Sequence, residues 1–486
     1  MFNSFESAMP RRPILLSNTV VAGVACFAPC HLFATESNGR QRFPSPFLAA
    51  GLLCIIFVAS AEIALAQNAP AMPLKLTLTE AVDIALKQNL DIQVANIETA
   101  IKQQDRAIAR SELLPHATLD ANDAVTRYNT KAVLGVQPSI IPREVGPYQS
   151  IHFGPSFSTP IFDLTLIRQY QESGHRLLAT EADEQTVREE TVLLAVSEYM
   201  AHLRALASIA TARSRIELAD RLAHQAADLL TDGVASKIDV SRAQVRLREE
   251  QQQLIDAQRD AETTLYSLKR ILSLPDSQQI EFADQGSFFS TPSLDLADPL
   301  STALQQRPEL HSLSESIRAA ELAHKTVVAQ SLPKVAFDGG WSEQGETFTT
   351  STPGYEYRVS MRVPIFTGGR LSAERKRTGL MEQQMQKRLA KERNSITEQV
   401  RDRQVELQAA LHQVELGRQQ IQLANEQVSL SQGRFQSGVT DNIEVTAAQD
   451  SLARANDAEI GALFRYNIAR AQLAHAVGSE EQTYSH

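Results

Sequence analysis

Apolar residues recur at every seventh position through much of the chain. One such series is Val400, Leu407, Val414, Ile421 and Val428, and another is Val240, Leu247, Leu254, Ala261 and Leu268. On a helix this spacing keeps the apolar side chains on one stripe, and helices with such stripes pack side by side with a left-handed supercoil. The pattern predicts long helices that pack lengthwise. A solvent-exposed coiled-coil rod would show the same pattern, so the heptads alone leave both forms open.

Four shorter segments alternate apolar and polar residues, which predicts strands with one apolar and one polar face. The predicted strands are 116–128, 149–159, 334–347 and 354–363. Strands of about ten residues with this alternation fit a membrane barrel with a wet interior, but a half-buried hairpin of a soluble protein alternates in the same way. Trp341, Tyr355 and Tyr357 would suit an aromatic belt at a membrane interface. Four strands cannot close a barrel, whereas three chains would supply twelve.

The predicted elements occur twice in the same order. The predicted helices are 79–113, 163–230 and 238–272, then 297–331, 367–436 and 443–477, with a break expected at Pro308. Residues 76–120 align without a gap on residues 294–338, at a separation of 218. A period of this length indicates a duplicated structural half, and oligomerisation of such chains makes a ring of similar elements. Each long helix should measure about 100 Å, and the two shorter helices of each half together match it, as expected for a tube of uniform height.

We divide the chain into six parts. These are an N-terminal extension with signal peptide (1–66), a linker (67–75), a first repeat (76–275), an inter-repeat linker (276–293), a second repeat (294–478) and a C-terminal tail (479–486). The apolar run 47–58 is followed by Ala64, Leu65 and Ala66 before Gln67, a pattern that predicts cleavage after Ala66. A cut after Ala61 and an uncleaved membrane anchor are the alternatives.

After residue 67 we expect no apolar run close to the roughly 20 residues of a membrane helix. A form that crosses a membrane would then have to use strands in a closed barrel. The formal net charge of −10 argues against a nucleic-acid partner. The sequence has no GxxxxGK[ST], HExxH or CxxC motif, and its three cysteines all precede residue 67. We therefore expect no catalytic, cofactor or metal site, and no enzyme.

Three short motifs occur once in each half. The first is a Leu-Pro pair, at 114–115 and 332–333, that ends a helix before a strand. The second is the sequence Pro-Ile-Phe at the exit of a strand. In the first half it contains Pro160 and Phe162. In the second half it contains Pro364 and Phe366, and Gly368 and Gly369 follow it. The third is the turn Gly-Val-x-x-x-Ile-[Asp/Glu]-Val-x-x-Ala-Gln, at 233–244 and 438–449. Together, twice and in this order, they resemble the outer-membrane efflux protein family of TolC-like channels.

This resemblance implies a mainly α fold with a small β part. Three chains would form a twelve-stranded transmembrane β-barrel in outer-membrane lipid and an α-helical barrel through the periplasm of a Gram-negative-type envelope. The implied function is a passive exit duct of a tripartite efflux pump or type I secretion system. Its implied partners are two further copies of the chain, a periplasmic adaptor protein and an inner-membrane transporter. A periplasmic coiled-coil adaptor or rod is the alternative, although adaptors usually have a single helical hairpin between small β-rich domains.

The resemblance places both Gly turns at the periplasmic tip, where the adaptor docks. The candidate docking residues are Gly233, Val234, Asp239, Gly438 and Val439. Glu444 occupies an acidic aperture position of the family, and Asp441 is a neighbouring candidate. Thr440 and Phe435 replace an Arg and a Tyr of the family, and Ala447 replaces a second acid, so the family's latch network is not reproduced. Alternatively, Glu444 and Asp239 are acids in the first turn of a helix, stabilised by its dipole.

Overall fold

The structure is a computed structural model that describes residues 73–136, 138–233, 235–292, 298–437, 439–440 and 442–485. The chain divides into two units, 1–70 and 71–486, and everything below concerns the second. The predicted cleavage site at Ala64, Ala66 and Gln67 lies outside the described residues. Val234, Gly438 and Asp441 also lie outside them.

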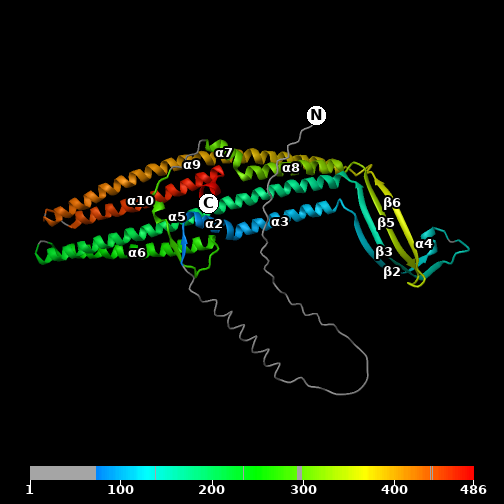
Figure 1. The fold of residues 1–486 in the computed structure, drawn as a ribbon, viewed down its shortest axis with the longest axis horizontal. Coiled ribbons are helices and arrows are strands. Elements are labelled where there is room, and N and C mark those ends of the chain that lie inside the picture. The colour runs from blue at the N-terminus through cyan, green and yellow to red at the C-terminus, as the bar shows by residue number, and fades with distance from the viewer. Residues whose placement is uncertain are drawn as a thin grey trace, which may run out of the picture. The chain divides into compact units, whose positions relative to one another are not determined.

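Long helices lie side by side and form most of this unit (Figure 1). The first half contains α2 (Leu78–Gln88), α3 (Leu90–Ser111), α5 (Leu164–Thr231) and α6 (Lys237–Ile271). The second half contains α7 (Pro299–Gln306), α8 (Pro308–Ala329), α9 (Arg370–Gln436) and α10 (Asn442–Val477), followed by the short α11 (Glu480–Tyr484). Helix α5 packs against α6, α8 and α3, and α9 packs against α10 and α8. The predicted long helices and their order are confirmed.

The first helix of each half is broken at the same place. The prediction of a single helix over 79–113 was wrong, because α2 ends and α3 begins at Asn89, which has φ −59° and ψ 133°. The Asn89 side chain accepts the Asp91 N–H at 2.8 Å and donates to the Ile271 carbonyl at 2.9 Å. In the second half the break falls at Arg307, which has φ −59° and ψ 120°, just before Pro308 as predicted. Asn89 and Arg307 are matching positions of the repeat, so the break belongs to the duplicated plan.

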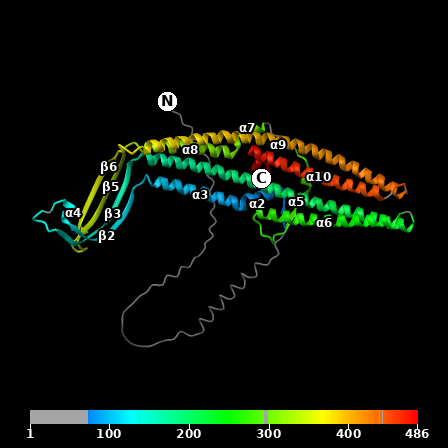
Figure 2. The same ribbon diagram turned by 180° about the vertical axis from the view of Figure 1, so that it is seen from behind.

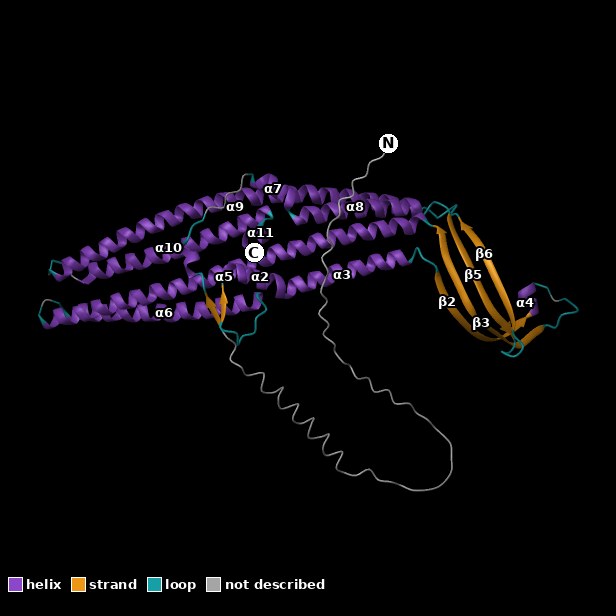
Figure 3. Ribbon diagram, in the orientation of Figure 1, coloured by secondary structure: helices purple, strands orange, loops and turns teal. Residues whose placement is uncertain are grey.

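A four-stranded antiparallel sheet lies at one end of the helices (Figure 3). Its strands are β2 (His116–Asn129), β3 (Glu144–Phe162), β5 (Lys334–Gly345) and β6 (Thr352–Arg362), in the order β2-β3-β5-β6. Strand β3 begins earlier than predicted, and the short α4 (Thr130–Leu134) lies in the connection from β2. The two halves meet between β3 and β5, where Ser158 pairs with Asp338. Strands β2 and β6 are therefore the two edges of this sheet.

The largest hydrophobic cluster surrounds α5 and contains a second, smaller sheet. There β1 (Leu74–Leu76) pairs in parallel with β4 (Ile280–Phe282), and the 3-10 helix η2 (Gln285–Phe289) follows. Tyr199 of α5 is fully buried, and its hydroxyl donates to the Leu76 carbonyl at 3.1 Å and to the Asp284 carboxylate. Burial of each large apolar side chain here contributes roughly 1.5–3 kcal/mol. The cluster ties the start of the unit and the inter-repeat segment to α5.

Helix α5 corrects one expectation from the sequence. It contains an 18-residue window that is long and apolar enough to cross a membrane by length and composition alone. Half of that window is buried inside the structure, as in the core helix of a soluble fold. Seen from behind, α5 runs between other helices (Figure 2). The ends where α5 leads into α6 and α9 leads into α10 lie opposite the sheet.

Candidate functional site at the helical tips and the sheet

Helices α5 and α6 form a hairpin whose turn contains Gly233. Gly233 has φ +74°, a left-handed conformation that glycine adopts without the steric cost of a side chain. Its N–H donates to the Leu230 carbonyl at 3.1 Å, and the Ala235 N–H donates to the Leu229 carbonyl at 3.0 Å. These bonds satisfy the last carbonyls of α5 and end the helix. The turn predicted at Gly233 is present.

Asp239 caps the start of α6. The backbone N–H and the hydroxyl of Ser236 donate to its carboxylate at 2.9 and 2.5 Å. Hydrogen bonds from the Ser236 side chain, and then from its backbone, lower the pKa of Asp239. This geometry is that of an acid in the first turn of a helix, where a negative charge is favoured.

The second hairpin joins α9 to α10. The Ser437 N–H donates to the Gly433 carbonyl at 3.1 Å, and the Val439 N–H donates to the Arg434 carbonyl at 3.0 Å. The Val439 side chain is 67% exposed. An apolar side chain is thus presented to solvent at the end of the molecule opposite the sheet.

Glu444, the candidate aperture acid, is held by two donors of its own hairpin. Arg434 donates to it at 2.9 Å and the Thr440 hydroxyl donates at 2.6 Å. Its side chain is 37% exposed. The sequence analysis did not identify Arg434. The pair of Arg434 and Glu444 joins the end of one helix to the start of the next, and the repeat gives no hint of it, because the matching position of the first half is Leu229. Thr440 therefore has a defined role beside Glu444.

Phe435, by contrast, points into the protein. It is 6% exposed and forms a small buried cluster with Leu222 of α5 and Val445 of α10. The cluster fastens the second hairpin to the first. Phe435 thus supports the tip from inside.

A groove runs between the two hairpins near their tips. It is lined from α6 by Ile238, Ser241, Arg242, Val245, Arg246 and Glu249, and from α10 by Ile443, Thr446, Ala447 and Asp450. Ile238, Val245 and Ile443 are each more than half exposed, at 57%, 57% and 51%. Arg246 spans the groove, since it pairs with Asp450 at 2.8 Å and with the buried Glu250 at 2.7 Å. The tips therefore offer apolar contacts framed by charge.

The strand-to-helix exits differ between the halves. Pro160 and Phe162 belong to β3, where they pair with Ala336 and Val335. Asp163 follows, accepts the Thr165 N–H at 2.8 Å and pairs with Lys334 at 2.9 Å. In the second half Pro364 and the 89% exposed Phe366 follow β6, and Gly368 and Gly369 have φ +59° and +85° before α9. An acid caps one long helix, whereas a glycine turn begins the other.

The sheet has one polar and one apolar face, as the alternation predicted. On the polar face Ser156 donates to Asp120, and Ser158 donates to Asp338, each at 2.7 Å. On the other face four side chains of β6 are 62–77% exposed, namely Tyr355, Tyr357, Val359 and Met361. A single chain thus exposes a broad apolar surface that water does not favour.

Comparison with known proteins gives one consistent result. The model of the outer membrane efflux protein family matches residues 81–273 and 300–479. The alkaline protease secretion protein AprF of Pseudomonas aeruginosa is 23% identical over 419 residues, 83% of this chain and 84% of that protein. The pyoverdine export outer membrane protein OpmQ of the same organism is 24% identical over 398 residues, 80% of each. The CmeC outer membrane channel of Campylobacter jejuni has the same fold, with a TM-score of 0.72, 19% identity and coverage of 83% of this chain and 86% of that one.

Proposed function

This chain belongs to the outer membrane efflux protein family, whose members are passive outer-membrane channels and not enzymes, and we propose that three copies form an exit duct through the envelope. The observation that carries the proposal is the open sheet, with its edges at β2 and β6 and its apolar face exposed. Open edges and exposed apolar surface are liabilities that proteins cover. A periplasmic rod or adaptor would leave this apolar face and these edges exposed to water.

Three sheets would close into a barrel of twelve strands. Strand β2 of one copy would pair with β6 of the next, which removes every edge. The face of Tyr355, Tyr357 and Val359 would meet lipid, with Tyr355, Tyr357 and Trp341 in an aromatic belt. The face of Asp120 and Asp338 would line a wet interior.

The helices would continue this barrel as a tunnel in the periplasm. Helices α5 and α9 have 68 and 67 residues, so each is about 100 Å long. The shorter helices of each half lie end to end beside the long helix. In the first half these shorter helices are α2, α3 and α6. Three copies would give a tube of nearly uniform height.

The hairpin tips would carry the partner contacts. We assign adaptor docking to the turns at Gly233, Val234, Asp239, Gly438 and Val439 and to the groove beside Ile238 and Ile443. The adaptor would connect the duct to an inner-membrane transporter, which supplies the energy. AprF is named for protease secretion and OpmQ for pyoverdine export, which supports an export duty in a type I secretion system or an efflux pump.

Glu444 would lie at the periplasmic aperture with Asp441 and Thr440 around it, while Phe435 supports this region from inside the protein. Three copies of one acid around a narrow opening favour cations over anions. Arg434 and Thr440 hold the Glu444 carboxylate, so they would set how far it reaches into the opening.

Electron microscopy of the chain extracted by detergent from outer membranes tests the proposal. We expect a particle with three-fold symmetry, a helical barrel of roughly 100 Å and a detergent belt around the sheet end. In planar bilayers it should form a water-filled pore. A rod that stays soluble without detergent would overturn the duct.

A further inference from the structure

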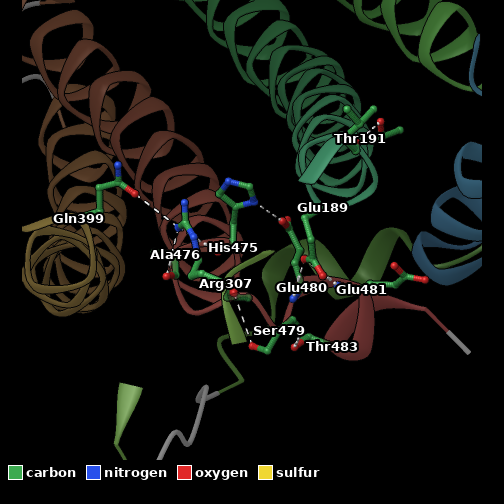
Figure 4. A network of polar contacts seen from close by, with 12 residues as sticks. Glu189, Thr191, Arg307, Gln399, His475, Ala476, Ser479, Glu480, Glu481 and Thr483 are labelled. Carbon is green, nitrogen blue, oxygen red and sulfur yellow. Dashed lines mark hydrogen bonds and ion pairs between the residues drawn. The ribbon is translucent and has the colours of Figure 1, made fainter. Parts of the chain in front are cut away.

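The C-terminal helix α11 lies beside a cluster of three titratable side chains (Figure 4). The C-terminus itself lies midway along the helices, away from both the hairpin tips and the sheet (Figure 1). Glu189 comes from α5, His475 from the end of α10 and Glu480 from α11. One nitrogen or oxygen of each lies within 4.8 Å of those of the other two. The Glu480 side chain is 0% exposed, Glu189 is 6% exposed, and the His475 side chain is 22% exposed.

One carboxylate oxygen in this cluster lacks a partner. His475 Nδ1 lies 3.0 Å from Glu480 Oε2. The other oxygen, Glu480 Oε1, is buried and has no hydrogen bond among the described residues. A buried polar atom without a partner costs about 1–3 kcal/mol, and more when charged. The cluster therefore lacks a group that would bind this oxygen.

The neighbouring cations are engaged elsewhere. Arg188 pairs with Glu481 at 2.5 Å. Arg307 pairs with Glu309 at 2.6 Å and donates to the Ala476 carbonyl at 3.2 Å. The buried carboxylates of Glu189 and Glu480 thus lie within 4.8 Å of each other beside a single imidazole. A bound cation or a retained proton would relieve this crowding.

We propose that Glu189, His475 and Glu480 form a binding site for one divalent transition-metal ion, best matched by Zn²⁺. One imidazole nitrogen and two carboxylate oxygens are a common set of zinc ligands. Bonds of about 2.0–2.1 Å to a tetrahedral ion place two ligand atoms about 3.3 Å apart. The 3.0 Å between His475 Nδ1 and Glu480 Oε2 is close to that spacing. The partly exposed side of His475 offers an entry path and a position for water.

The surroundings of the cluster suit this role. Glu189 Oε2 accepts the backbone N–H groups of Glu480 and Glu481 at 3.2 and 3.3 Å, which fixes the carboxylate in place. Hydrogen bonds of this kind hold metal ligands in orientation. The ion would fasten the C-terminal helix to α5 and α10.

Calorimetric titration of Zn²⁺ into the full chain, purified in detergent and treated with EDTA, tests the site. We expect one Zn²⁺ per chain. His475→Gln or Glu480→Gln should weaken binding at least tenfold, since each removes a ligand. His412→Gln is the control for the imidazole, because His412 is 75% exposed on α9. Glu481→Gln is the control for the carboxylate, because Glu481 is adjacent to the site but pairs with Arg188. Both controls should bind as the parent chain does.

A folded parent chain that binds no Zn²⁺ would overturn the site and leave a proton between the carboxylates. Binding that both ligand variants retain would overturn it as well. If the variants do not fold, X-ray absorption of the zinc-loaded parent chain decides the matter. One imidazole nitrogen with carboxylate oxygens supports the site, whereas two or more imidazoles place the ion elsewhere. None of these outcomes bears on the duct.

Discussion

Asp239 and Glu444 occupy matching positions after the two hairpin turns, yet different side chains hold them. Ser236, just before α6, binds Asp239, whereas Arg434, at the end of α9, reaches across the turn to Glu444. The first acid is therefore a helix cap. The second lies in the first turn of α10 and also links that helix to α9.

Glu444→Gln should reduce the cation selectivity of the pore or its block by divalent ions, since it removes one negative charge per copy at the proposed aperture. Reversal potentials in bilayer recordings measure the first effect. Asp239→Asn is the matched control. It should remove the favourable negative charge at the start of α6, at a cost of about 0.3–1 kcal/mol, and leave selectivity unchanged. Equal selectivity in Glu444→Gln and the parent channel would refute the aperture role.

His202 makes the stability of the fold depend on pH. It is 4% exposed in α5, its ring lies 4.4 Å from that of Phe282, and burial lowers its pKa from 6.5 to about 4. Above pH 6.5 the imidazole is neutral in both folded and unfolded chains. As the pH falls from 6.5 to 4, the unfolded chain binds a proton that the folded chain excludes. Stability should therefore fall in that window, by up to about 3 kcal/mol.

Thermal unfolding at pH 7.5 and pH 5 checks this. His202→Gln should show a smaller drop in midpoint between the two pH values than the parent chain. His412→Gln, at an exposed position, should show the same drop as the parent. A drop in His202→Gln equal to that of the parent would assign the acid sensitivity to other groups.

At the scale of elements, periodicity predicted the helices and strands well, because heptads and alternation are local. The break at Asn89 was missed although a signal was available. Asn is a favoured N-cap, and its position matches the one before Pro308 in the repeat. The two breaks therefore occupy the same position of the duplicated chain, although only the second is marked by a proline.

The tip could be predicted only in part. The turn at Gly233 has its own sequence signal, but the bond from Arg434 to Glu444 depends on how two helices meet. The cluster of Glu189, His475 and Glu480 was missed entirely, because it joins residues up to 291 positions apart. Single side chains far apart in sequence leave no period or motif.

Gly233→Ala should destabilise the first hairpin by about 1–2 kcal/mol, because a left-handed residue with a side chain is strained. No heavy atom lies within 4 Å of the added methyl group, so the cost is that of the backbone alone. Gly433 in α9 also has open space but no positive φ. Gly433→Ala should stabilise its helix by roughly 0.5–1 kcal/mol. Amide hydrogen exchange at the two tips measures both, and equal effects would contradict the assigned turn.

At the scale of the whole molecule, the two faces of β6 should respond oppositely to the same charge. Val359→Arg places a cation on the face assigned to lipid, at about 2–4 kcal/mol per chain near mid-membrane. Ser360→Arg places it on the polar face beside Asp338, which accepts a hydrogen bond from Ser360 at 3.3 Å. The first should reduce the trimer recovered from outer membranes. The second should assemble normally and change conductance.

These two variants also test which face of the sheet meets lipid and which lines the interior of the barrel. If Ser360→Arg fails to reach the outer membrane while Val359→Arg assembles, the faces are assigned the wrong way round. Equal loss in both would mean that neither of these two positions of β6 accepts an added cation, and would leave the two faces unassigned.

The two hairpins of each chain differ at their tips, and this difference affects how many partner molecules can bind to one duct. The proposed trimer would present six tips of two alternating kinds, one capped by Asp239 and one linked through Arg434 and Glu444. A partner that accepts either kind would bind six times, in two quasi-equivalent poses. A partner that distinguishes them would bind three times. Counting bound partners per duct, for example by native mass spectrometry, would thus report which of the two duplicated surfaces is recognised.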